Sequence, residues 1–210
     1  MATTRTMTSL RTVAAHTTRS RQFHTTRKAL VQIGDAIPDI DLMENSPGNK
    51  ISIAKELKGK GLIIGVPGAF SPACSASHIP GYLNSPRLKH AGQVFVVSVN
   101  DPFTMKAWAA SLDEGSKSGV CIDVHAKKHP DGSMKWEKAD IGEQIRFLAD
   151  AQGAFTRAVE MEWDATAAFG QPRSKRYALL IEDGQVKEVH VEPDNTGVNV
   201  SAADKVLGRA

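Results

Sequence analysis

The sequence predicts an α/β domain in which helices cover both faces of one central sheet. Residues 61–66, GLIIGV, form a continuous apolar run that is typical of a strand buried on both faces. Residues 93–99, QVFVVSV, form a second such run, and residues 101–112 behind it carry apolar side chains at helical spacing. Near the C-terminus, Asp183-Gly184 separates two strand-like segments and gives the strongest short hairpin signal in the chain.

The segment before the first core strand is predicted to be extended and rich in turns, with one short helix. Residues 33–52 contain Pro38, Pro47 and Gly48 and are expected to form an extended, turn-rich lead-in. Residues 53–58 are expected to form a short polar helix. The first strand of the sheet is therefore expected only after this helix.

The turn after this strand places a cysteine at the start of a helix. Pro67-Gly68 ends the strand, and Ser71-Pro72 offers an N-cap and a first-turn proline. A helix is expected from about residue 73 to residue 78. Cys74 would then lie in its first turn.

The rest of the chain continues the alternation of strands and helices. Pro80 is expected to bend or interrupt the helix before a second helical segment at residues 82–90. Residues 113–140 are long, polar and without a clear period, so we expect an exposed insertion with at most one short helix. The remaining predicted elements are a helix over residues 101–112, capped by Asp101 and buried through Met105, Trp108 and Leu112, a strand over 146–149, a helix around 154–160, strands over 177–182 and 186–191, and a last helix over 202–207.

The N-terminal 29 residues differ in charge from the rest of the chain. They carry six basic residues and no acidic one, because the first acidic residue is Asp35. Without them the chain has 20 basic and 23 acidic residues, so the net charge changes from +3 to −3. This Arg-, Ser- and Thr-rich composition predicts a mitochondrial transit peptide at residues 1–29, cleaved between about Phe23 and Leu30, and a domain at 30–210 that works in the matrix. The alternative is a basic tail that stays in place.

Several classes of protein do not fit the composition. The body of the chain has no basic stripe, which argues against a nucleic-acid partner, and no apolar run approaches the roughly 18 residues that span a bilayer, which argues against a membrane partner. The two cysteines, Cys74 and Cys121, form no CxxC pair, no four-ligand zinc set and no disulfide framework. This pattern indicates an intracellular protein with one or two individual thiols.

Cys74 is placed where a thiol can be reactive. A thiol attacks as the thiolate, and a free thiol with a pKa near 8.5 is only about 3% ionised at pH 7. The unpaired N–H groups and dipole of a helix first turn favour the anion, and Ser71 can donate a hydrogen bond to the sulfur or to an incoming oxygen. Ionisation gains only a few-fold in rate, because the nucleophilicity of a thiol falls with its pKa. The site must therefore also bind a small polar reactant and stabilise the charge that develops on it.

Residues 67–74, PGAFSPAC, match the PxxxT/SxxC motif of peroxiredoxins, and residues 66–82, VPGAFSPACSASHIPGY, resemble the type II, peroxiredoxin 5 subfamily in particular. The resemblance continues over about residues 30–207, apart from the insertion. The matching stretches are SVNDPF at 98–103 with Trp108, FLAD at 147–150 with GAF at 153–155, KRY at 175–177, and residues 182–193.

This resemblance implies a thioredoxin-like α/β fold, with a central mixed sheet flanked by helices, and reduction of peroxides. Cys74 would be the peroxidatic thiolate, which attacks a peroxide oxygen, becomes sulfenic acid and releases water or an alcohol. Ser71 would hydrogen-bond the peroxide and Pro67 would shield the pocket. Arg176 would hold the thiolate and polarise the peroxide.

The resemblance also implies the substrate side and the partners. The N–H groups of Ala73 and Cys74, together with Gly68, would complete the peroxide site. No metal or organic cofactor is expected, because sulfur supplies the redox couple. The expected substrates are hydrogen peroxide and organic hydroperoxides, the expected reductant is glutathione with glutaredoxin or thioredoxin, and the expected assembly is a homodimer.

Some assignments stay open in the sequence. Arg173 is the rival of Arg176 for the active-site role. His78, one helical turn after Cys74, could act as a base, but we expect it to pack structurally. Asn100 matches the family and is expected to form a turn.

The second cysteine has three interpretations. Some subfamily members carry a resolving cysteine that would fall close to Val200 here, and this chain has none. Cys121 could resolve Cys74 across a dimer, could be a bystander, or could form a metal site with His125 and His129. We expect a bystander, and hence a one-cysteine mechanism.

Two other functions would use Cys74. A peroxide sensor would pass its oxidation to a partner and turn over little. A disulfide reductase of thioredoxin fold is disfavoured, because Ser77 stands where the second cysteine of a CxxC pair would be.

Overall fold

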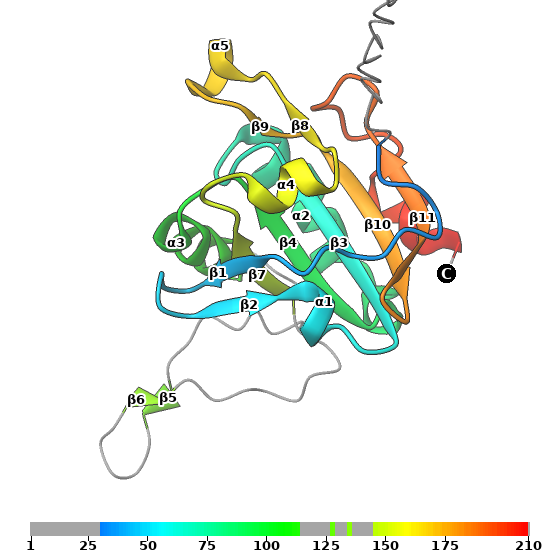
Figure 1. Cartoon of the computed structure of the whole chain (residues 1–210), viewed down its shortest axis with the longest axis horizontal. Coiled ribbons are helices and arrows are strands. Elements are labelled where there is room, and N and C mark those ends of the chain that lie inside the picture. Colours follow the sequence, from blue (N-terminus) through cyan, green and yellow to red (C-terminus); the bar gives the residue numbers. More distant parts are fainter. Residues whose placement is uncertain (1–29, 114–126, 129–133, 136–144, 210) are drawn as a thin grey trace, which may run out of the picture.

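The computed structural model describes residues 30–113, 127–128, 134–135 and 145–209, and its centre is a seven-stranded mixed sheet (Figure 1). The order of the strands is β11-β10-β3-β4-β7-β1-β2. The three central strands are parallel, and the others pair antiparallel. The strands are β1 Asp41–Glu44, β2 Lys50–Ser52, β3 Lys60–Val66, β4 Gln93–Ser98, β7 Ile145–Ala149, β10 Tyr177–Glu182 and β11 Gln185–Val191.

Helices cover both faces of the sheet, as the sequence predicts. On one face, Leu62 and Ile64 of β3 pack in a cluster with residues of α2 (Ile79–Leu83), α3 (Pro102–Asp113) and α6 (Ala203–Val206). On the other face, Ile63 packs in a second cluster with residues of α1 (Ile53–Glu56) and α4 (Ala154–Ala158). Alternate side chains of one strand thus enter two cores, which is why the strand reads as a continuous apolar run.

Two local predictions are confirmed in detail. Asp101 caps α3, because its Oδ1 accepts from the N–H groups of Phe103 and Thr104, each at 2.9 Å. The Asp183-Gly184 turn joins β10 to β11 with both residues at positive φ, 52° and 75°, as a two-residue hairpin turn requires.

The lead-in over residues 33–52, predicted to be extended and rich in turns, contains two strands that the sequence did not reveal. β1 and β2 form a hairpin in which Asp41 pairs with Ser52 and Met43 with Lys50. This hairpin buries Leu42 and extends the sheet beyond β7. The proline-glycine pair in its turn masked strands that are only four and three residues long.

The helix is not interrupted at Pro80, where the sequence predicts a bend or an interruption. A π-helical turn, Cys74–His78, leads directly into α2, and the N–H of Ile79 donates to the carbonyl of Cys74. Pro80 lies in the first turn of α2, directly after the π-helical turn. Of the helix predicted over residues 82–90, α2 covers the part up to Leu83 and a 3-10 turn covers Leu88–His90. Pro86 separates the two, because it disfavours helical geometry in the residue before it.

Two further regions depart from the predicted pattern. A small unit of β8 (Glu162–Trp163), α5 (Thr166–Phe169) and β9 (Arg173–Ser174) extends from the sheet between α4 and β10 (Figure 1). Within the insertion, β5 (Lys127–Lys128) and β6 (Met134–Lys135) pair antiparallel, and most of the remainder lies outside the described residues. Among the helices that are described, none is long and apolar enough to cross a membrane.

Candidate active site

Cys74 lies at the carboxyl end of β3, beside the carboxyl end of the parallel strand β4. It is fully buried in the π-helical turn. Asn100 Oδ1, just beyond β4, accepts from the N–H of Ala69 at 3.0 Å and fixes the loop before Cys74. Asn100 is thus a structural residue of the turn, as expected, and ligand sites commonly form where such strands end.

Ser71 reaches the sulfur instead of capping the helix. Its Oγ lies 2.8 Å from Cys74 Sγ and 2.9 Å from the carbonyl oxygen of Gly68. A hydroxyl has one proton, so it donates to one of these two acceptors at a time. The position expected to serve as an N-cap therefore directs its side chain to the reactive atom.

Arg176 reaches the same sulfur from the start of β10. Its Nη1 lies 3.3 Å from Cys74 Sγ, and its Nε donates to the carbonyl of Thr196 at 2.9 Å. Its rival Arg173 donates to the carbonyl of Val99 and lies over the ring of Phe169, 5.2 Å from the centroid. The structure therefore brings Arg176 to Cys74 and directs Arg173 elsewhere.

His78 connects Arg176 to the C-terminal part of the chain. Its Nδ1 lies 3.1 Å from Arg176 Nη1, and its Nε2 lies 3.1 Å from the carbonyl oxygen of Ser201. A guanidinium only donates, so Nδ1 is the acceptor and Nε2 carries the proton. Burial and the charge of Arg176 lower the pKa of His78 to about 3, so the ring is neutral at physiological pH. Both nitrogens are engaged away from the sulfur, which favours the structural interpretation over the base.

The remaining predicted site residues line the same turn. Pro67 and Gly68 are buried, and Ala73 is half-buried beside Cys74. A Cβ added to Gly68 would lie 3.1 Å from Cε1 of Phe169, so the glycine allows this ring close to the loop. No local pattern pointed to Phe169, because its contact joins segments about a hundred residues apart.

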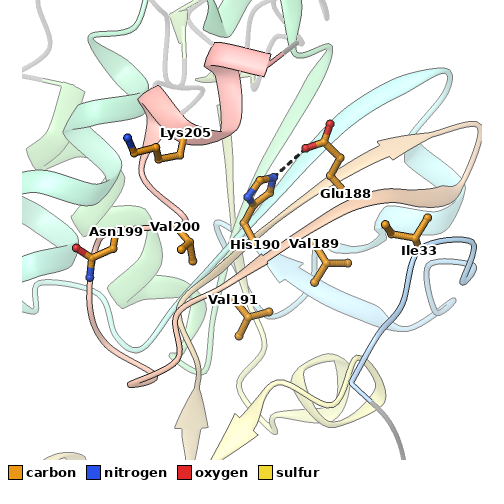
Figure 2. Close-up of a pocket in the computed structure, with 8 residues that line it drawn as sticks. All are labelled: Ile33, Glu188, Val189, His190, Val191, Asn199, Val200 and Lys205. Carbon is orange, nitrogen blue, oxygen red and sulfur yellow. Dashed lines mark hydrogen bonds and ion pairs between the residues drawn. The ribbon is translucent and has the colours of Figure 1, made fainter.

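Cys121, His125 and His129 lie outside the described residues, so their three interpretations stay predictions. Within the described ranges, no cluster of His, Cys, Asp and Glu could hold a metal ion. Around Val200, where a resolving cysteine would fall in some relatives, the structure has a cavity of about 630 Å³ (Figure 2). It lies against β11 and is lined by Ile33, Glu188, Val189, His190, Val191, Asn199, Val200 and Lys205.

A buried thiol that contacts a hydroxyl and a guanidinium, on a mixed sheet covered by helices, defines a thiol-based redox protein. The Redoxin family model matches residues 32–207. The peroxisomal membrane associated protein 20 of Schizosaccharomyces pombe is 38% identical, and peroxiredoxin-2C of Oryza sativa is 34% identical, each over 85% of this chain and 98% of the relative. Reduced Prx3 of Vibrio vulnificus, solved with hydrogen peroxide, matches at 29% identity and a TM-score of 0.67, over 86% of this chain and 100% of that one.

The chain belongs to the Redoxin family, as a peroxiredoxin of the type II, peroxiredoxin 5-like kind. The thioredoxin-like fold predicted from the sequence is confirmed. The predicted enzyme class, a thiol-dependent peroxidase, is confirmed as well.

Proposed function

We propose that this protein reduces hydrogen peroxide and alkyl hydroperoxides at Cys74. The observation that carries the proposal is the convergence of Ser71 Oγ and Arg176 Nη1 on Cys74 Sγ, at 2.8 and 3.3 Å. The thiolate attacks the peroxide oxygen that bears the proton, the O–O bond breaks, and the products are a sulfenic acid and an alkoxide or hydroxide. The leaving oxygen then takes a proton from solvent and departs as alcohol or water.

The surrounding groups stabilise charge in this step. Negative charge moves from the sulfur to the leaving oxygen, so fixed donors beside both atoms lower the barrier. Arg176 supplies a donor whose position is set by two further hydrogen bonds, and Ser71 supplies a hydroxyl that can turn from the sulfur to the peroxide. Pro67, Gly68 and Ala73 would shape the cavity around the reacting oxygens.

We favour a one-cysteine cycle. An external thiol attacks the sulfenic acid and releases water, and a second thiol reduces the mixed disulfide and regenerates Cys74. Glutathione with glutaredoxin, or thioredoxin, is the proposed reductant. The absence of a cysteine near Val200 supports this cycle, and resolution by Cys121 across a dimer is the competing route.

We also propose a homodimer in the mitochondrial matrix. Phe70, in the loop before Cys74, and Phe103, at the start of α3, are 53% and 62% exposed, and we propose them as contacts of the dimer. Sedimentation equilibrium tests the assembly. The fission-yeast relative is named for the peroxisomal membrane. N-terminal sequencing of the native protein therefore tests the location, and an intact start at Met1 or Ala2 would contradict matrix import.

The central experiment measures peroxide consumption by wild type, Cys74→Ser and Cys121→Ser with each reductant. We expect turnover in wild type and Cys121→Ser and none in Cys74→Ser. Retained activity in Cys74→Ser would refute the assignment. A covalent dimer on non-reducing gels that disappears in Cys121→Ser would establish the two-cysteine route. Stoichiometric oxidation of Cys74 without turnover would favour the sensor.

A further inference from the structure

The segment 192–201, which joins β11 to α6 without regular structure, wraps around Arg176. The N–H of Arg176 donates to the carbonyl of Asn195 at 2.7 Å, and its carbonyl accepts from the N–H of Glu192 at 3.0 Å. Its side-chain Nε donates to the carbonyl of Thr196 at 2.9 Å. We call this segment the 192–201 loop, and its backbone conformation sets where the guanidinium lies.

Glu192 holds the far end of this loop. Its side chain is buried, and its Oε1 accepts from the N–H groups of Asn199 and Ser201 and from the hydroxyl of Ser201, at 2.7, 2.9 and 2.7 Å. The carbonyl of Ser201, fixed in this way, accepts from His78 Nε2 and from the hydroxyl of Tyr82, at 3.1 and 2.6 Å. Burial and, after it, the charge of Glu192 raise the pKa of Tyr82, so its hydroxyl stays protonated and donates.

We propose that Glu192 is a positioning residue of the peroxidase site, an inference that rests on the proposed function of Cys74 and Arg176. One carboxyl oxygen fixes the loop, and two carbonyls of the loop then orient the guanidinium. Thr196 binds its Nε directly, and Ser201 binds His78, which accepts from the same Nη1 that lies against the sulfur. Glu192 itself does not touch the reacting atoms.

The loop needs this acceptor because it has no strand or helix to satisfy its N–H groups. Buried backbone donors require partners, and here one side chain supplies the partner for two of them. The other oxygen, Oε2, is buried without a hydrogen-bond partner among the described residues.

The test compares Glu192→Ala, Glu192→Asp and Glu192→Gln in the full chain. The readouts are the second-order rate of Cys74 oxidation by hydrogen peroxide, the pH at which Cys74 reacts with iodoacetamide as a thiolate, and Tm. Small displacements of a catalytic group are costly, so we expect Glu192→Ala to lower the rate about 10- to 100-fold and to move thiolate formation to higher pH. Glu192→Asp should give an intermediate rate, because its side chain is one methylene shorter and its oxygen lies farther from the loop.

Glu192→Gln should retain most of the wild-type rate, since its amide oxygen can accept the same three hydrogen bonds. If Glu192→Gln is as slow as Glu192→Ala at unchanged Tm, charge acts instead of hydrogen bonds and the proposal is wrong. It is also wrong if folded Glu192→Ala and Glu192→Asp both keep the wild-type rate and thiolate titration.

Two controls complete the test. Glu188→Ala removes a carboxylate of β11 that pairs with His190 and should leave all three readouts unchanged. Val186→Ala opens the opposite core and should lower Tm without moving thiolate formation. An equal shift in Val186→Ala would overturn the proposal, because general loosening would then explain it. An inactive wild type with normal thiolate titration would instead refute the proposed function.

Discussion

Two arginines, the partly buried Arg146 and the fully buried Arg176, have partners of different charge. Arg146 on β7 donates from Nε and Nη2 to the two carboxylate oxygens of Glu44, both at 2.6 Å, and from Nη1 to Glu56 at 2.9 Å. Burial acts to lower the pKa of Arg146, and the hydrogen bonds and charges of these two carboxylates outweigh it, so the pKa is raised. Its charge is fully compensated.

Arg176 is more deeply buried, at 1% exposure, and has weaker partners. It donates to a carbonyl, to a neutral imidazole and to the sulfur of Cys74, and it takes part in none of the ion pairs found among the described residues. A buried cation is costly unless an anion balances it. Arg146 is thus held by two carboxylates, whereas the guanidinium of Arg176 lies directly against the sulfur whose negative charge it would stabilise.

The largest effect on activity is expected for Arg176→Gln. Removing a preorganised donor from such a site costs about 10² to 10³ in rate, so we expect peroxide reduction to fall by that factor while Tm changes little. Arg176→Lys keeps the charge, but an ammonium group cannot reproduce the three contacts that the planar guanidinium makes. We therefore expect its peroxide reduction to remain slow. Stopped-flow oxidation of Cys74 measures both. A fast Arg176→Gln together with a slow Arg173→Gln would show that the roles were exchanged.

The opposite result is expected for Arg146→Met. It leaves Glu44 and Glu56 without their cation in a partly buried site, so we expect a loss of about 2 to 4 kcal/mol in the free energy of unfolding, below the full value for a buried pair. The rate of Cys74 oxidation per folded molecule should not change. Urea denaturation measures the loss, and the control is Arg146→Met with Glu44→Gln, which should recover part of it. A rate loss like that of Arg176→Gln would contradict the comparison.

How much of the site the sequence could predict depends on whether its residues are neighbours in the chain. The turn with Pro67, Gly68, Ser71 and Cys74 is contiguous, so its strand, turn and helix signals add up locally. The contacts of Arg176 are not contiguous, because they depend on how β10 is placed beside β3 and on the course of the 192–201 loop.

The errors in the fold have related causes. The β1–β2 hairpin was missed because its strands are too short to show alternation, and tertiary pairing with β7 stabilises them. The general rule that proline disrupts a helix interior predicts an interruption at Pro80, whereas the chain continues there from a π-helical turn into α2. Local propensity thus predicts the scaffold well and the remote members of the site poorly.

The next prediction concerns the effect of acid on His78, the neutral partner of Arg176. The pKa of His78 is about 3 in the folded protein against 6.5 in the unfolded chain, so the unfolded state binds more protons between these values. The stability from keeping this ring neutral is complete above pH 6.5 and falls as the pH drops toward 3, by up to about 1.4 kcal/mol per pH unit. In His78→Gln this component is absent, so its stability curve should converge on that of wild type at acid pH. Urea titrations from pH 7 to 4 measure it, with the exposed His90→Gln as the control, and parallel curves would contradict it.

The smallest effect is expected at Ser71, and it asks how much of the charge on the sulfur Arg176 balances alone. Ser71→Ala removes the hydroxyl that lies 2.8 Å from Cys74 Sγ, and the loss of one hydrogen bond to a charged group predicts a rate about tenfold lower. Ser71→Thr keeps the hydroxyl and should react close to wild type. If the two donors act on the same charge, the double variant Ser71→Ala with Arg176→Gln should lose less than the product of the single losses. Fully multiplicative losses would mean that Ser71 and Arg176 act independently and do not share the charge on the sulfur.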